Sequence, residues 1–157
     1  MFKSLSSNSA DTVAATTRKA WLGAVGIAVL AVLLGCLNRY LGFAHPHHST
    51  VRLAEVAAFG KWAPAAIEHF IGGFGLLSLL TLLVTPWNAA TPRFRMLASA
   101  GLAVVYIVFS TIAQDGHAYL ATHDSEQLAQ IVADVLAIAA AMFWLARPAS
   151  GPAVHTP

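Results

Sequence analysis

Two apolar runs of about twenty residues, each with ionisable groups inside it, constrain this chain more than any other feature. Residues 66–84 read AIEHFIGGFGLLSLLTLLV and contain Glu68 and His69 near their start. Residues 127–146 read QLAQIVADVLAIAAAMFWLA and contain Asp134. A helix of roughly 20 apolar residues spans a hydrocarbon core roughly 30 Å thick. Ionisable groups within such a helix are costly in lipid, so they usually face protein or water.

The composition of the chain also indicates a membrane protein. Of its 157 residues, 57% are apolar and only 10% are charged, whereas soluble domains carry about 25% charged residues. A chain this short cannot enclose so much apolar surface in a core of its own. The formal net charge is +2 without a basic cluster, which argues against nucleic acid as a partner. Cys36 is the only cysteine, so no internal disulfide forms.

The apolar runs predict an all-α fold, an integral membrane four-helix bundle. The lipid bilayer is therefore the first expected partner. A cleaved signal peptide is the alternative for the first run, but residues 20–37 are longer than a usual signal core and no small-residue cleavage site follows them. The predicted membrane domain covers residues 20–146, with spans at about 20–42, 64–85, 96–114 and 127–146.

The basic residues favour an orientation with both termini in the cytoplasm. With the N-terminus inside, the inner side collects six cations: Lys3, Arg18, Lys19, Arg93, Arg95 and Arg147. The outer side collects three: Arg39, Arg52 and Lys61. Cytoplasmic loops carry an excess of Lys and Arg. Residues 1–19 and 147–157 are therefore predicted to be cytoplasmic tails of a multi-pass membrane protein.

The first loop, residues 43–62, contains a segment expected to lie along the membrane interface. Its part VRLAEVAAFGKW predicts a short amphipathic helix. The same loop holds His45, His47 and His48, but a tetrahedral metal site needs further ligands with suitable spacing. Bis-histidine haem needs imidazoles on two helices, and only His69 lies clearly within a span. We therefore predict neither a metal nor another cofactor.

Matched depth is the main argument for a polar site. Spans two and four both enter from the outer face, with His69 about six residues and Asp134 about seven residues along them. At 1.5 Å per residue, both lie roughly 9–11 Å below the outer interface. Small residues in both spans allow close helix packing. We expect His69 and Asp134 to meet in an outward-facing polar pocket.

Further polar residues are candidates for the same pocket. Gln127, Gln130 and Asp134 share one helical face, as do Ser110 and Gln114 at the outer end of span three. The pocket candidates are Glu68, His69, Gln114, Gln130 and Asp134, and the secondary candidates are Ser110, His117 and His123. The alternative is that these side chains only join the helices, as interhelical hydrogen bonds do in many membrane proteins.

Three short motifs resemble the VanZ-like family of small bacterial membrane proteins. AIEHFIGGFGLL (66–77) is similar to the family's acidic-Lys-x-x-His-Phe motif, with Glu68, His69 and Phe70 in matching places and Ala65 and Ala66 instead of the acidic-Lys pair. STIAQ (110–114) resembles its Glu-x-x-Gln stretch, with Thr111 in place of the acid. ADVLAIAAA (133–141) resembles its Asp-x-x-Ala-Asn motif, with Ile138 in place of the Asn.

The resemblance implies a role in the cell envelope, with a lipid-linked or peptidoglycan-related ligand in the outward-facing pocket. It does not name a reaction, so whether the protein is an enzyme stays open. A small proton-coupled transporter is the first alternative, and four spans would then require a homo-oligomer, most simply a dimer. The second alternative is a purely structural or accessory membrane subunit.

Overall fold

The structure is a computed structural model that describes residues 4–44, 50–85 and 91–147. All regular elements in these residues are helical, as the sequence predicts. Four helices are long and apolar enough to cross a membrane: Thr12–Leu41, Ala63–Val84, Arg93–Thr122 and Ser125–Ala146. The elements are α1 (Ser4–Ala44), α2 (Thr50–Phe59), α3 (Ala63–Val84), α4 (Pro92–Tyr106), the π-helix η1 (Ile107–Gly116), α5 (His117–Thr122) and α6 (Ser125–Ala146).

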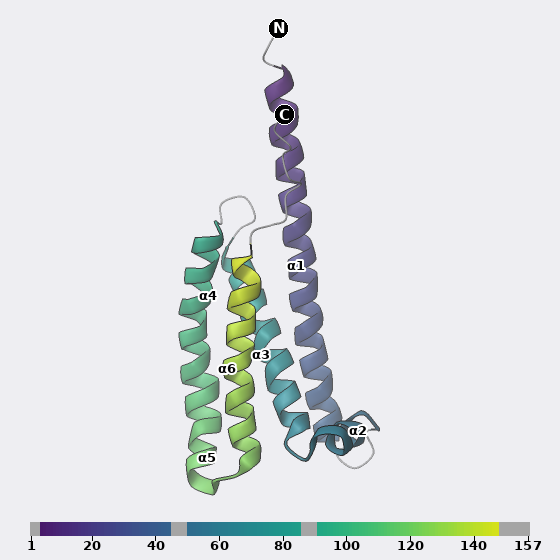
Figure 1. Ribbon diagram of the computed structural model, residues 1–157, viewed down its shortest axis with the longest axis vertical. Coiled ribbons are helices and arrows are strands. Elements are labelled where there is room, and N and C mark those ends of the chain that lie inside the picture. Colours follow the sequence, from purple (N-terminus) through teal and green to yellow (C-terminus); the bar gives the residue numbers. More distant parts are fainter. Residues whose placement is uncertain (1–3, 45–49, 86–90, 148–157) are drawn as a thin grey trace.

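Helix α3 occupies the centre of the bundle. It packs against α1 on one side and against α6 and α4 on the other, and α1 runs along the outside of this group (Figure 1). The short helix α2 lies across one end, as expected for an interfacial segment, and α5 lies at the same end. We call this the α2 end. The opposite end, which contains Arg93, Arg95 and Arg147, is the arginine end.

Helix α1 is longer than the sequence predicts. Its 41 residues extend about 60 Å, so its N-terminal part projects beyond the bundle at the arginine end (Figure 1). We expected residues 1–19 to be a tail, but the chain is helical from Ser4 onward. The segment contains no Gly or Pro before Gly23, and extending an existing helix needs no new nucleus. Residues 148–157 of the predicted C-terminal tail lie outside the described part.

The third span is also longer than predicted. It continues through η1 and α5 to Thr122, so most of the expected loop 114–126 is helical. His123, at φ 54° in the left-handed region, ends α5. The Asp124 side chain then accepts a hydrogen bond from the Glu126 backbone N–H and caps the start of α6. His45, His47 and His48 lie outside the described residues.

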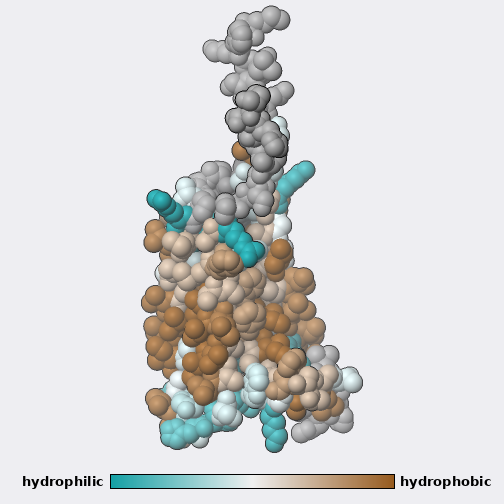
Figure 2. All heavy atoms as spheres, viewed as in Figure 1, coloured by the Kyte–Doolittle hydropathy of each residue, from teal (hydrophilic) through white to brown (hydrophobic). Residues whose placement is uncertain are grey.

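The bundle has small residues inside and large apolar residues outside. The buried residues include Ala28, Ala63, Ala65, Ala103, Ala137 and Ala141. On the face shown in Figure 2, hydrophobic residues form a belt between two more hydrophilic ends. Large apolar side chains are exposed, among them Leu83 and Phe143 at 61% and 66%. Helices that pack through small residues and present large apolar ones outward suit a lipid environment.

Helices α1 and α3 approach most closely at glycines. A Cβ atom at Gly75 would lie 2.6 Å from the Val32 backbone nitrogen and 2.8 Å from Ala31 Cβ. A Cβ atom at Gly35 would lie 2.8 Å from Gly72 Cα. No larger residue fits at Gly35 or Gly75 without separating the two helices. This crossing fixes α1 against α3, the helix that also contains Glu68 and His69.

Candidate functional site

Asp134 is the centre of a polar cluster inside the bundle. It lies nine residues after the start of α6, about 14 Å along the helix from the α2 end. Its side chain is 0% exposed. A carboxylate buried this deeply requires hydrogen-bond donors around it. The structure supplies these donors from α3, α4 and η1.

Three hydroxyl groups face the two carboxylate oxygens of Asp134. The Tyr106 hydroxyl donates to Oδ1 at 2.7 Å. The Thr111 hydroxyl donates to Oδ2 at 2.9 Å, and the Ser110 hydroxyl lies 3.5 Å from the same oxygen. Hydrogen bonds to an ionised acceptor are stronger than neutral ones. These contacts therefore both stabilise the buried carboxylate and join α6 to the third span.

The π-helix η1 places Ser110 and Thr111 on the same side as Tyr106. In an α-helix, Thr111 would point about 140° away from Tyr106 around the axis. In a π-helix the hydrogen bonds join residues five apart, so one turn takes between four and five residues. Ser110 and Thr111, four and five positions after Tyr106, therefore point to nearly the same side of the helix as Tyr106. Both hydroxyls consequently reach Asp134. A π segment is uncommon and is frequently found at a functional site.

His69 approaches the same carboxylate from α3. Its Nδ1 atom lies 3.1 Å from Asp134 Oδ1, and its side chain is 14% exposed. The expected meeting of these two residues is therefore confirmed. A carboxylate at Asp134 accepts a hydrogen bond from Nδ1–H, which leaves Nε2 as the proton-accepting atom of a neutral ring. Such a histidine, oriented by a carboxylate, is suited to accepting and returning a proton.

Gly73 makes room for this cluster. A Cβ atom at this position would lie 2.7 Å from the Tyr106 hydroxyl oxygen and 3.3 Å from Ala137 Cβ. The absence of a side chain lets Tyr106 pass over α3 and reach Asp134. The same feature lets α6 pack closely beside α3 through Ala137, which is 0% exposed.

Glu68 belongs to a separate contact. It forms an ion pair with Arg39 of α1, whose Nη1 lies 2.9 Å from Glu68 Oε1. Next to this pair, the buried Asn38 side chain donates to the Pro64 carbonyl oxygen at 3.2 Å. These two contacts join α1 to the start of α3 near the α2 end. Glu68 thus lies beside His69 in the chain but points towards α1.

Of the remaining predicted residues, Ser110 belongs to the Asp134 cluster. Gln130 is half-buried on α6 one turn before Asp134, and no described hydrogen bond connects it with Asp134. His117 and His123 are exposed on or beside α5, and His123 contacts the Tyr119 ring. Gln114 lies in η1, but its side chain is outside the described part of the structure.

The sequence analysis did not include Tyr106 or Thr111 among the site residues. Tyr106 lies four positions before Ser110, and a tyrosine within an apolar span usually finds a hydrogen-bond partner. That spacing was a usable signal for Tyr106. For Thr111 no α-helical spacing would have helped, because its direction depends on the π-helix.

An apolar groove leads away from two of the cluster hydroxyls. It has a volume of about 440 Å³ and lies between α3 and the α4–η1 span. Tyr106 and Ser110 of the cluster are among the residues that line it, while the rim residues Leu80, Val105 and Phe109 are 39%, 54% and 72% exposed. The rest of the lining is apolar: Leu76, Leu77 and Leu102. The groove therefore opens sideways, within the hydrophobic belt.

Comparison of the chain with protein-family models, with curated proteins and with solved structures finds no match. The resemblance to the VanZ-like family consequently rests on the three motifs of the sequence. Each of those motifs contributes to the Asp134 cluster: His69 from the first, Thr111 from the second and Asp134 itself from the third. In the second, Thr111 occupies the place of the acid and donates to Asp134.

Proposed function

We propose that this protein is a VanZ-like inner-membrane protein of the cell envelope that binds a lipid-linked, peptidoglycan-related ligand from the outer leaflet. The observation that supports this most is the buried Asp134, surrounded by His69 and three hydroxyls and connected to an apolar groove. Under the orientation with both termini inside, this site lies in the leaflet away from the cytoplasm.

The groove suits the hydrocarbon part of such a ligand. It lies at the level of the hydrophobic belt, and its exposed rim allows a chain to enter laterally from the bilayer. From Ser110 it runs along the helices towards Leu80 and Leu102, which are nearer the middle of the bundle. A chain in the groove would therefore point to the bilayer centre while its polar head stays near Asp134.

The hydroxyl groups determine what kind of head fits. Ser110 lines the groove and donates its proton to Asp134, so its oxygen keeps lone pairs for a ligand that enters there. A ligand group that donates a hydrogen bond, such as a sugar hydroxyl or an amide N–H, is complementary to them. A fully ionised phosphate, which only accepts hydrogen bonds, is not. This chemistry favours a glycan- or peptide-bearing lipid over a simple phospholipid.

The test is binding of two lipids that share one chain. Nanodiscs that contain either a polyprenyl-linked disaccharide-peptide or the bare polyprenyl phosphate are equilibrated with the purified protein. We expect preferential binding of the former, and loss of that preference in Tyr106→Phe. Tyr119→Phe is the matched control, because Tyr119 lies in α5 outside the groove. Equal binding of the two lipids would contradict the proposal.

A purely structural role gives a different result in the same experiment. If the cluster only holds helices together, Tyr106→Phe and His69→Ala will lower the thermal stability in detergent and leave lipid preference unchanged. Under our proposal, His69→Ala and Asp134→Asn also abolish the envelope phenotype in cells while the folded protein still accumulates in the membrane.

The direct contact between His69 and Asp134 supports one second candidate, a proton-coupled transporter that works as a dimer. Two titratable groups within hydrogen-bond distance inside a membrane can pass a proton between them. This function predicts a proton flux into proteoliposomes that depends on a solute gradient and is lost in Asp134→Asn. Absence of flux for envelope-related solutes would leave the lipid-binding function as the better account.

A further inference from the structure

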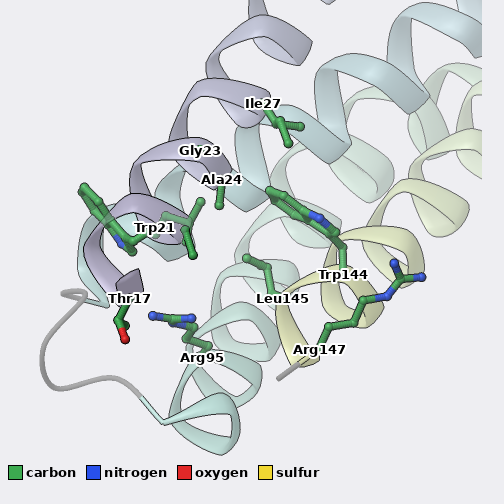
Figure 3. A pocket seen from close by; sticks show the side chains of 11 residues that line it. Thr17, Trp21, Gly23, Ala24, Ile27, Arg95, Trp144, Leu145 and Arg147 are labelled. Carbon is green, nitrogen blue, oxygen red and sulfur yellow. The ribbon is translucent and has the colours of Figure 1, made fainter. Parts of the chain in front are cut away.

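The arginine end contains a second cavity, about 350 Å³ in volume, far from the Asp134 cluster. It lies between α1, α4 and α6, with Leu82 of α3 also in its lining. In Figure 3 the side chains of Trp21 and Trp144 lie on opposite sides of the cavity, and Arg95 extends from α4 towards Thr17 and Trp21. A charged group is thus directed into a space enclosed by several helices.

Two nitrogen donors at this cavity have no partner among the described residues. They are Nε of Arg95 and Nε1 of Trp21, and both atoms are buried. Burying an N–H without an acceptor is unfavourable, so such a group usually has a water or ligand acceptor. The Thr17 hydroxyl lines the same cavity, although it donates to the Val13 carbonyl oxygen at 2.9 Å. The cavity therefore offers hydrogen-bond donors that no acceptor among the described residues satisfies.

The electrostatic environment at this end favours an anion. None of the acidic side chains that the structure describes lies there, since Glu55, Glu68, Asp124, Glu126 and Asp134 all belong to the half nearer the α2 end. Arg93 and Arg95 lie in the first turn of α4, where the helix dipole is already positive. A bound anion would interact favourably with the Arg95 guanidinium, which lines the cavity, and with the helix N-terminus.

The surroundings identify the form of the anion. Ile27, Leu82 and Leu145 provide an apolar wall next to the donors, and Arg95 and Arg147 line the cavity at the arginine end. Tryptophans at this level are typical of the headgroup region. A guanidinium binds phosphate oxygens in pairs. The guanidinium of Arg147, in contrast, lies over the Phe143 ring at 4.6 Å, so it adds charge at the edge only.

We propose that this cavity binds the phosphate group of an anionic phospholipid, with Arg95 and the Trp21 indole N–H as donors and the apolar wall against the upper part of an acyl chain. With the arginine end in the cytoplasm, the lipid belongs to the inner leaflet. This site is independent of the ligand proposed for the Asp134 cluster, because the two lie at opposite ends of the bundle.

The test uses the full chain in nanodiscs that contain equal amounts of phosphatidylglycerol and phosphatidylcholine. Native mass spectrometry of the released protein counts the retained lipids of each kind. We expect the wild-type protein to retain phosphatidylglycerol preferentially, and Arg95→Gln to lower its affinity by about tenfold or more, as loss of charge-assisted hydrogen bonds does. Arg93→Gln is the matched control, because it removes the same charge from an exposed residue of the same helical turn.

A second variant keeps the test valid if Arg95→Gln folds poorly. Trp21→Phe retains an aromatic ring and removes only the indole N–H, so it should weaken phosphatidylglycerol retention while the helical circular dichroism stays unchanged. Equal effects of Arg93→Gln and Arg95→Gln, or no preference between the two lipids, would overturn the proposal. Displacement of the lipid by millimolar inorganic phosphate would show a site for a soluble anion and overturn the lipid assignment.

Discussion

The hydroxyl oxygen of Tyr106 lies only 2.7 Å from the position that a Cβ atom would occupy at Gly73. The same hydroxyl donates to Asp134 at 2.7 Å. One missing methyl group on α3 therefore permits the contact between the third and fourth spans. This relationship makes Gly73 a sensitive position for testing the structure.

Gly73→Ala should displace Tyr106 from Asp134 and destabilise the fold by about 1–3 kcal/mol, the usual effect of overpacking. The free energy of unfolding can be measured by titration with a denaturing detergent. Gly72→Ala is the control, because a Cβ atom there meets nothing within 4 Å. If the two substitutions had the same effect, Tyr106 would not lie against α3 as described.

Asp134 and Thr111 should be energetically coupled. Thr111→Val removes the hydroxyl that donates to Oδ2 at 2.9 Å and keeps the side-chain shape. Combined with Asp134→Asn in a double-mutant cycle, it should give an interaction energy of about 0.5–2 kcal/mol in unfolding. Thr81→Val is the matched control, because the buried Thr81 hydroxyl bonds only to the Leu77 carbonyl of its own helix. Additive effects for Thr111 would show that the π-helix does not present it to Asp134.

The glycines between α1 and α3 should tolerate no added carbon. Gly75→Ala and Gly35→Ala each place a Cβ atom less than 3.0 Å from the facing helix, so both should lower the thermal unfolding midpoint in detergent. Gly23 and Gly26 also lie in α1, but a Cβ atom at either position meets nothing within 4 Å. Gly23→Ala and Gly26→Ala should therefore leave the unfolding midpoint unchanged, or raise it slightly because alanine has the higher helix propensity. A midpoint for Gly75→Ala equal to that of Gly23→Ala would contradict the close crossing.

The orientation can be measured with single cysteines introduced into a Cys36→Ser background. Ser125→Cys at the α2 end should react with a membrane-impermeant maleimide in intact cells, because the positive-inside rule places that end outside. Ala15→Cys, exposed on the projecting part of α1, should react only after the cells are permeabilised. The reverse labelling pattern would place the Asp134 cluster in the cytoplasmic leaflet and remove the basis for an outer-leaflet ligand.

Several features of this protein were predictable from local sequence. The four apolar helices follow from run length, since about 20 residues are needed to cross the hydrocarbon core. The short helix α2 follows from the pattern in residues 51–62, and its position at the membrane interface stays a prediction. The meeting of His69 and Asp134 was predictable as well, because a fixed rise per residue places the two side chains at the same depth on helices that enter from one side.

Other features depended on the tertiary structure. The continuation of the third span through residues 107–122 and the contribution of Thr111 depend on a π-helix, which no α-helical spacing reveals. Glu68 is next to His69 in the chain, yet successive residues of a helix point about 100° apart, and the packing of α1 through Gly35 and Gly75 brought Arg39 to it. The cavity around Arg95 exists only because four distant segments meet at one end. Sequence thus determined which residues form long apolar helices and how far along each helix the polar side chains lie, while helix rotation and close packing decided which of them touch.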